Sequence, residues 1–408
     1  MRGIRTGIEE TADAPPRQAS DDGRMETSHS PAPLRVVVLG GGVAAAETCL
    51  ALAHLAGDRV TTTIVARNDR LELRAASVGE AFGAAATARV NLAAIAADAG
   101  AELLPGTASS IDTEERRVHL DDGSVIPYQA LVVACGAKPD DAIPGAVTFT
   151  GPRDVHRIRA VMEDAVRGDI HRIAFAVPAN VGWTLPLYEL CLLASRHLRR
   201  WAPQPAELSI VTPEAAPLEA FGATASAEVG RILAQAGIGF IGMRTPIDAL
   251  AGRLRTAPHG ALQTDRVIAL PKLTGVFISG LPADRDRLLP TDRHGRVGDL
   301  AEVYAAGDIT GFPVKQGGIA TEQADAVAES IAADAGAPIR PAPFRPVLRG
   351  LLITGRGDRY LRADLAGGSG ETSEIGSEPP WWPPVKTAGR YLGPYLAGLA
   401  RSQDAKSR

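Results

Sequence analysis

Cysteine is scarce in this sequence, because the 408 residues hold only three, Cys49, Cys135 and Cys191. The three lie far apart, no C-x-x-C occurs, and none is paired with histidine at the spacing of a metal site. This pattern argues against a structural zinc site and favours a reducing compartment. Cys49 and Cys191 fall within helical patterns, where a buried thiol is usually inert. We therefore predict no metal site.

The sequence also lacks a strong charge of one sign and a long apolar run. The formal net charge is −4, which gives no electrostatic case for binding nucleic acid or an anionic membrane. The most apolar window, residues 36–56, contains Glu47 and glycines and is interpreted as a buried strand and helix. No secretory signal pattern opens the chain, so a cytoplasmic location is expected. Residues 1–33 are rich in Pro, Ser and charge and predict a disordered tail, with Met25 as an alternative start.

The most informative stretch runs from Leu34 to Ala56. The apolar run Val36 to Leu39 suits a strand buried on both faces, and an Ala-rich helical stretch follows three glycines. Gly40-x-Gly42-x-x-Ala45 fits the dinucleotide-binding fingerprint. A helix that begins here offers free N–H groups to a pyrophosphate. We predict a dinucleotide site at this turn, with a glycine-rich turn in an ordinary α/β core as the alternative.

A second β-α-β-α-β pattern spans residues 170–243, but its first turn lacks the glycine fingerprint. The stretch Val177 to Trp183 places Pro178 and Trp183 where a dinucleotide turn needs glycine. Glu214 follows a predicted strand and is a candidate for a ribose hydroxyl, with a solvated turn residue as the alternative. In the first unit Asp69 is the corresponding weak candidate, three residues past the expected place. Binding of a nicotinamide dinucleotide by this second unit therefore stays open.

The last part of the chain is the least regular. Strands are predicted at Leu348–Thr354 and Asp358–Ala363, and Gly367–Pro380 is predicted as a low-complexity loop. Val385–Arg401 is expected to form a short amphipathic helix that Pro394 interrupts. Two roles stay open for this helix. It could dock within the molecule or in a homodimer, or it could contact the inner face of a membrane.

Three separate motifs point to one family. They are the Gly40 turn, the strand that ends Ala134-Cys135-Gly136, and the strand that ends Ala305-Ala306-Gly307-Asp308. The set resembles the pyridine nucleotide–disulfide oxidoreductase superfamily, nearest to the branch of type II NADH dehydrogenases and sulfide:quinone oxidoreductases. The resemblance covers about residues 34–335.

The resemblance implies FAD in the first domain. Gly40, Gly42 and Ala45 would hold the pyrophosphate, and Asp308 would accept hydrogen bonds from the ribityl hydroxyls. Cys135 stands where the family has Thr. The helix that begins near Gly318 would direct its positive end at the flavin. The predicted cofactor-binding residues are Gly40, Gly42, Val43, Ala44, Ala45, Arg67, Arg74, Ala134, Cys135, Gly136, Gly307, Asp308, Lys315, Gln316 and Gly318.

The chain also departs from the family. Residues 57–134 contain no cysteine pair, which excludes the dithiol chemistry of the disulfide reductases. Residues 178–186 and 310–320 contain no cysteine either, which argues against sulfide oxidation through a persulfide. No constellation of His or carboxylates is readable, so no catalytic residue is predicted.

The predicted fold is α/β, with two Rossmann-like dinucleotide-binding domains, one inserted in the other, and a small C-terminal region. The FAD domain would comprise residues 34–150 and 275–340, the inserted domain residues 151–274, and a cap residues 341–408. We expect a monomeric or homodimeric FAD-dependent oxidoreductase that passes electrons from a donor, with NAD(P)H favoured, to a quinone or another small acceptor. The alternatives are a sulfide- or thiol-oxidising flavoprotein, a flavin-binding sensor or assembly protein without turnover, and a non-flavin NAD(P) enzyme.

Overall fold

The computed structural model describes residues 32–84, 86–258, 260–366, 369–370, 372–387 and 389–406. The predicted disordered tail, apart from residues 32 and 33, and the alternative start Met25 lie outside the described residues.

A five-stranded parallel sheet is built on the strand that the apolar run predicts. The strand β1 (Leu34–Leu39) lies in the centre, where it pairs with β2 and β9. Leu39 is level with Val65 on one side and with Val133 on the other, so the carboxyl ends of the three strands meet at one edge. The strands of the sheet lie in the order β20 (Val303–Ala305), β9 (Ala130–Val133), β1, β2 (Val60–Ala66) and β5 (Glu102–Pro105).

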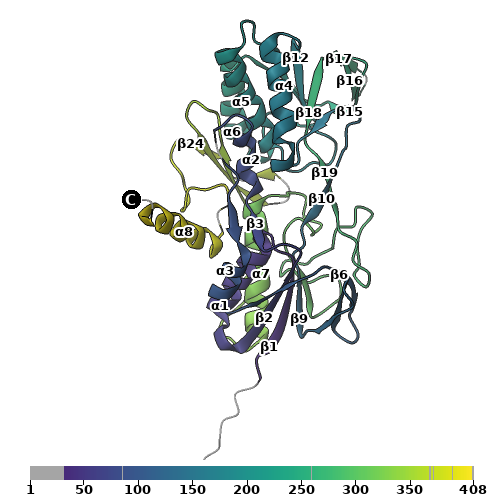
Figure 1. The fold of residues 1–408 in the computed structure, drawn as a ribbon, viewed down its shortest axis with the longest axis vertical. Coiled ribbons are helices and arrows are strands. Elements are labelled where there is room, and N and C mark those ends of the chain that lie inside the picture. Colours follow the sequence, from purple (N-terminus) through teal and green to yellow (C-terminus); the bar gives the residue numbers. More distant parts are fainter. Residues whose placement is uncertain are drawn as a thin grey trace, which may run out of the picture. The chain divides into compact units, whose positions relative to one another are not determined.

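Alternate residues of β1 enter two different cores, as the two-residue period of a strand requires. Val36 and Val38 pack with α1 (Val43–Leu55) and α7 (Gly317–Asp334) on one face. Val37 and Leu39 pack on the other face with a small sheet of β6 (Ala108–Asp112), β7 (Arg117–Leu120) and β8 (Val125–Pro127). Figure 1 shows α1 and α7 beside each other along this sheet. Both faces of β1 are therefore buried, as the continuous apolar run predicts.

A second parallel sheet carries its own core. Its strands lie in the order β11 (Val147–Thr148), β18 (Arg266–Ala269), β12 (Arg172–Ala176), β13 (Glu207–Val211) and β14 (Ile238–Ile241). Apolar residues of α4 (Val155–Arg167), α5 (Leu185–Trp201) and α6 (Ala223–Gln235) form the associated cluster. A hairpin sheet of β15 (Thr245–Leu250), β16 (Arg253–Ala257) and β17 (Gly260–Gln263) follows.

The chain leaves the first sheet and returns to it through two adjacent antiparallel strands, β10 (Ala137–Asp140) and β19 (Lys272–Gly275). This pairing explains how one unit is inserted in another, and the predicted α/β fold with two Rossmann-like units is confirmed. The division at residues 34–150 with 275–340, 151–274 and 341–408 stays a prediction. The strand β11 begins at Val147, before the predicted boundary, and pairs with the second sheet.

The region between β2 and β5 differs from the prediction. The sequence predicts a helix over Val90–Ala99, and the structure has one, but it begins two residues later because residues 89–91 form β4 (Arg89–Asn91), which pairs with β3 (Arg70–Glu72). Asn91 then caps α3 (Leu92–Asp98), because its side chain accepts hydrogen bonds from two backbone N–H groups of the first turn. The remaining short helices here are η1 (Gly57–Arg59), η2 (Arg74–Ala76) and α2 (Ser77–Glu80).

The C-terminal region also corrects two expectations. The predicted loop Gly367–Pro380 contains β23 (Ser369–Gly370) and β24 (Glu374–Gly376), which pair with β22 (Arg359–Ala366), itself beside β21 (Val347–Leu352). The last helix, α8, spans Leu392–Lys406, so it begins later than expected. Pro394 does not interrupt α8, because it lies in the first turn, where a helix has no use for that N–H.

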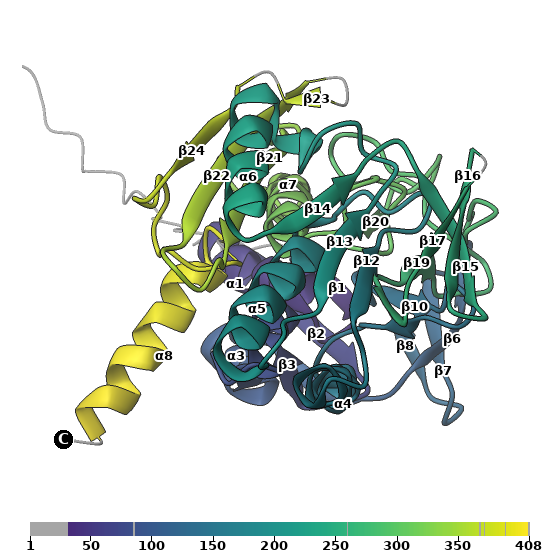
Figure 2. The same cartoon turned by 90° about the horizontal axis from the view of Figure 1, so that it is seen from above.

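Figure 2 shows α8 leading away from the strands of this region, with β24 beside α6. Across the described residues, the structure contains no helix with the length and apolar character needed to cross a bilayer.

Candidate flavin and substrate cleft

A cleft of about 1230 Å³ opens at the carboxyl ends of β1, β9 and β20 and extends to the second sheet. Ligands of open α/β sheets bind at this edge. Of the fifteen predicted cofactor-binding residues, Ala45 and Gly318 do not line the cleft. The ones that do are Gly40, Gly42, Val43, Ala44, Arg67, Arg74, Ala134, Cys135, Gly136, Gly307, Asp308, Lys315 and Gln316.

Gly40 lies where the backbone admits no side chain. Its φ of +125° is unfavourable for other residues, and a Cβ atom would lie 2.3 Å from the carbonyl oxygen of Ala134. The turn from β1 to α1 packs against the strand end at Ala134 and therefore depends on this glycine. Gly42 differs, because a Cβ atom there would meet no protein atom within 4 Å. The space beside Gly42 is open toward the cleft.

The first turn of α1 presents free backbone donors to that space. Gly42 precedes the helix without a side-chain cap, and its carbonyl oxygen accepts from the N–H of Ala46. The N–H groups of Val43, Ala44 and Ala45 come earlier in the helix and have no helical acceptor. Such a turn binds anions through its N–H groups and the positive end of the helix. Ala45 is fully buried, so it contributes close packing and its backbone N–H, not a wall of the cleft.

Asp308 lies just after β20, at the same edge of the sheet as the α1 turn and separated from β1 by β9. Burial raises the pKa of its carboxyl above the ordinary value, while the charges of Lys315 and Arg74 lower it. Within the described part of the chain, no residue donates a hydrogen bond to this carboxylate. A largely buried carboxylate without a hydrogen-bond donor from the protein suits a ligand that carries hydroxyl groups.

The open space at Gly42, the free N–H groups of α1 and the unpaired carboxylate of Asp308 together fit FAD. The first two suit a pyrophosphate, and the third suits the ribityl hydroxyls. Gly307 lies close to the same helix, because a Cβ atom on it would be 3.2 Å from the Cβ of Ala44.

The thiols of the chain are not activated. Burial raises the pKa of Cys135 to about 11 and that of Cys49 to about 12, and it also raises the pKa of Cys191. All three are therefore neutral thiols at neutral pH, and a thiolate is the form that acts as a nucleophile. Cys135 lines the cleft, but as an uncharged group beside the α1 turn.

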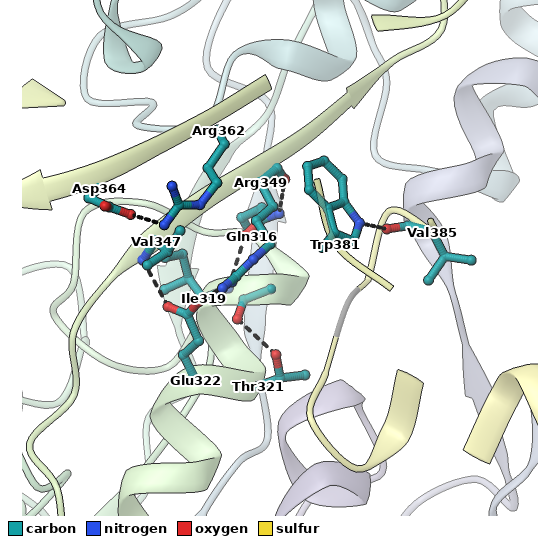
Figure 3. Close-up of polar contacts among 11 residues, drawn as sticks. Gln316, Ile319, Thr321, Glu322, Val347, Arg349, Arg362, Asp364, Trp381 and Val385 are labelled. Carbon is teal, nitrogen blue, oxygen red and sulfur yellow. Dashed lines mark hydrogen bonds and ion pairs between the residues drawn. The ribbon is translucent and has the colours of Figure 1, made fainter. Parts of the chain in front are cut away.

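The start of α7 forms the far wall of the cleft, and Figure 3 shows its polar contacts. Gln316 caps the helix by accepting from the N–H of Ile319 at 2.9 Å, and its amide donates to the carbonyl oxygen of Arg349 at 2.9 Å. Arg349 in turn forms an ion pair with Glu322. Two hydrogen bonds therefore hold Gln316 in place, so its predicted contact with the cofactor would be made by a fixed side chain.

A C-terminal segment, residues 385–387 and 389–392, closes one side of the cleft; we call it the strap. Lys386 donates to both carboxylate oxygens of Glu189 in α5, at 2.7 and 2.6 Å. Thr387 lies against the start of α7, since its hydroxyl is 3.0 Å from where a Cβ on Gly317 would be. Lys386, Thr387 and Glu189 all line the cleft.

The other end of the strap is anchored on α1. The buried carboxylate of Glu47 accepts from the N–H groups of Tyr391 and Leu392, at 2.8 and 2.7 Å. The strap thus ties α5 of the second unit to α1 and α7 of the first.

Glu214 lies at the carboxyl end of β13, on the second unit's side of the cleft. Its carboxylate accepts from the hydroxyls of Thr184, Tyr188 and Thr212, at 2.9, 2.7 and 2.9 Å. Burial raises its pKa, while these three hydrogen bonds lower it.

Sequence reasoning missed the strap and its partner. Lys386 and Glu189 are separated by 197 residues, and neither belongs to a local motif. Arg349, Lys272 and Arg153 also line the cleft and were not predicted. Among the residues that the structure describes, no cluster of His, Cys, Asp and Glu could hold a metal ion.

Comparisons with known proteins give a family match. Residues 6–153 match the family model described as pyridine nucleotide-disulphide oxidoreductase. Among curated protein sequences, none is significantly similar to the chain.

Solved structures match over most of the chain at low identity. The sulfide:quinone oxidoreductase of Aquifex aeolicus is 17% identical, covers 84% of this chain and 87% of its own, and gives a TM-score of 0.72. The putidaredoxin reductase–putidaredoxin complex is 17% identical, covers 82% of each chain and has a TM-score of 0.60. A ferredoxin reductase of Rhodopseudomonas palustris is also 17% identical, covers 82% and 83%, and has a TM-score of 0.59. These likenesses establish the fold.

Proposed function

We propose that the chain, whose residues 6–153 match the pyridine nucleotide-disulphide oxidoreductase family model, holds FAD in the Gly40–Asp308 half of the cleft and passes electrons between two small molecules. The observation that carries the proposal is the meeting, at one strand edge, of the open Gly42 turn and the unpaired Asp308 carboxylate. FAD needs both, because its pyrophosphate seeks helix N–H groups and its ribityl chain seeks acceptors.

The chain's own residues would bind and orient the cofactor. Val43, Ala44 and Ala45 would donate backbone N–H groups to the pyrophosphate, and Asp308 would accept from the ribityl hydroxyls. The start of α7 would face the flavin with its positive end, which favours the negative charge that the ring gains on reduction. When bound, FAD supplies the reversible uptake of two electrons, which no side chain here provides.

The acceptor in this proposal is a quinone or another small molecule, as the resemblance to the family implies. One of the matched structures is a sulfide:quinone oxidoreductase and another is a ferredoxin reductase, so enzymes named for a quinone and for a redox protein both occur on this fold. Sulfide and thiol oxidation gain no support from Cys135, Cys49 or Cys191, whose thiols burial keeps neutral.

An anaerobic cycle tests the function. The FAD-loaded protein is first reduced in the absence of oxygen, with NADH, NADPH, sulfide and the compact donor 1-benzyl-1,4-dihydronicotinamide supplied in turn, and a water-soluble quinone is then added. We expect bleaching of the flavin by one of the donors and its recovery on addition of the quinone. A flavin that no donor bleaches, although dithionite does, would contradict turnover and support a sensor or assembly role.

A further inference from the structure

We propose that the second half of the cleft excludes nicotinamide dinucleotides and that the electron donor is a compact two-electron reductant without an adenosine diphosphate group. This inference rests on the proposed flavin function, since the bound flavin takes up the two electrons that the donor loses. It runs against the NAD(P)H preference that the sequence indicates, and three features of the second unit carry it.

The first feature is the turn between strand and helix. In the first unit only residues 40–42 separate β1 from α1, which is the tight turn that a pyrophosphate needs. In the second unit residues 177–184 separate β12 from α5. This longer loop displaces the helix from the strand end. Gly182 in the loop lies against the first unit, because a Cβ atom on it would be 2.3 Å from the carbonyl oxygen of Pro313.

The same loop brings a bulky side chain to the helix start. The ring of Trp183 packs 5.8 Å from that of Phe221, and Trp183 also lines the cleft. The indole of Trp183 would therefore lie where the diphosphate of a dinucleotide needs to approach backbone N–H groups without an intervening side chain.

The second feature is the supply of backbone donors. The first turn of α1 offers three N–H groups, from Val43, Ala44 and Ala45. The first turn of α5 begins with Leu185 and Pro186, and proline has no N–H. The N–H of Leu187 already donates to the carbonyl oxygen of Thr184 at 2.9 Å. One donor, on Leu185, remains for a phosphate, which is too few for the anion site of a dinucleotide.

The third feature is the carboxylate that would receive the adenosine ribose. Glu214 is 8% exposed and is held by three hydroxyls, from Thr184, Tyr188 and Thr212. Tyr188 is also committed, since its hydroxyl accepts from the N–H of Leu218 at 3.3 Å. A ribose would have to displace hydroxyl donors that are buried, and each would lose its partner.

The carboxylates on the second unit's side of the cleft also disfavour a diphosphate. Glu214, Glu219 and Glu189 all line this side of the cleft. Lys386 neutralises Glu189, and its ammonium group is occupied by both carboxylate oxygens of that residue. The carboxylates of Glu214 and Glu219 repel the two negative charges of a diphosphate and oppose the attraction of Arg153, which also lines the cleft, while an uncharged compact molecule is affected by neither.

The walls that remain suit a small donor. Val181, Trp183 and Phe312 are apolar and line the cleft between the second unit and the loop before α7. A compact molecule can contact them and reach the flavin half without using the turn of α5.

Two nicotinamides separate the possibilities: NADH, and 1-benzyl-1,4-dihydronicotinamide, which carries the same reducing ring without the adenosine diphosphate. Their rates with the FAD-loaded protein are each divided by the rate with free FAD, which corrects for intrinsic reactivity. We expect the protein to favour the benzyl compound over NADH by about tenfold or more, with NADH showing no saturation up to about 1 mM. A corrected preference for NADH, with saturation in the micromolar range, would overturn the inference while leaving the flavin function intact.

Binding of ADP-ribose, measured calorimetrically, tests the same point without flavin reduction. We expect no binding to the second half of the cleft. Micromolar binding that Glu214→Gln weakens would overturn the inference, whereas micromolar binding that this variant leaves unchanged and FAD displaces would be occupation of the Gly40 turn, as the inference predicts. A chain that takes up no FAD would contradict the proposed function alone, because the effect of Glu214→Gln can still be measured.

Discussion

Lys386 donates to both carboxylate oxygens of Glu189, although 197 residues separate the two in the sequence. The carboxylate of Glu189 is fully buried, and 14% of the Lys386 side chain remains exposed. Glu189 also accepts from the backbone N–H of Ile353 at 2.9 Å. The pair therefore joins three distant segments, α5, the end of β21 and the strap, at one wall of the cleft.

Removing one member of this pair should be costly. Lys386→Met leaves the buried carboxylate of Glu189 without its counter-charge, and we expect the free energy of unfolding to fall by about 3–5 kcal/mol. Denaturation by urea at neutral pH measures the change. The control is Arg390→Met, which removes the strap's exposed ion pair with Glu329 and should cost less than about 1 kcal/mol. Equal losses in the two variants would contradict the account.

Gly42→Ala separates binding from folding. The added Cβ meets no protein atom within 4 Å, and the φ of −90° suits alanine, so we expect a folded chain that loses about 1 kcal/mol or less. FAD affinity should fall by about tenfold or more, because the methyl group occupies the space of the pyrophosphate. Fluorescence titration with FAD and thermal unfolding of the free chain measure the two effects.

Gly40→Ala is the matched contrast. Its Cβ would lie 2.3 Å from a carbonyl oxygen and its φ is +125°, so we expect this variant to lose stability as well as FAD. Equal losses of stability in the two variants would contradict this steric difference, and an unchanged FAD affinity in Gly42→Ala would argue against a ligand at Gly42.

A shared proton should make the stability depend on pH. Asp325 has a pKa raised to about 8, chiefly by burial and then by the neighbouring charge of Glu47. Burial also raises the pKa of Glu47, but the N–H groups of Tyr391 and Leu392 lower it, so we assign the proton of the pair to Asp325.

The direction of this pH dependence follows from the pKa of Asp325 in the folded and in the unfolded chain. The unfolded chain releases this proton near the ordinary aspartate pKa of 3.8, while the folded chain keeps it to about pH 8. The stabilisation is therefore complete below pH 3.8 and is lost as the pH rises toward 8. Asp325→Asn cannot titrate, so the decline in its unfolding free energy across this range should be smaller than that of the wild type. Parallel pH profiles for the two chains would show that Asp325 carries no such proton.

Asp308 should strengthen FAD binding and lower the stability of the FAD-free chain. Burial raises its pKa, so an ionised Asp308 destabilises the free chain at neutral pH. We expect Asp308→Asn to raise the thermal stability of the free chain and to weaken FAD binding, because the amide is a poorer acceptor for the ribityl hydroxyls. A variant that loses both stability and FAD would indicate a structural role instead.

The sequence predicts the first half of the cleft well because each of its parts is local. The Gly40 turn follows a strand whose continuous apolar run marks it as buried on both faces, and Asp308 follows another such strand. The carboxyl ends of parallel strands meet at one edge, so the motifs converge wherever the strands are placed correctly. Ala45 and Gly318 were included because the motifs contain them, but they serve packing and the helix backbone.

The rest of the cleft depends on contacts that no local pattern encodes. Lys386 follows a stretch of proline and tryptophan, and nothing in that stretch predicts its ion pair with Glu189. The helix predicted over Val90–Ala99 begins two residues late for a similar reason, because the pairing of β4 with β3 is decided by the partner strand and not by helical propensity. Glu214 was recognised as a candidate, yet the hydroxyls of Thr184 and Tyr188 that occupy it come from the start of α5, which is distant in sequence.

FAD in the Gly40–Asp308 half of the cleft is the central claim. The most direct measurement is a titration of the purified, flavin-free chain with FAD, followed by flavin fluorescence and by visible absorption after gel filtration. We predict one FAD bound per chain, with weaker binding in both Gly42→Ala and Asp308→Asn. A folded chain that retains no FAD, or one whose FAD binding is unaffected by either substitution, would contradict the account.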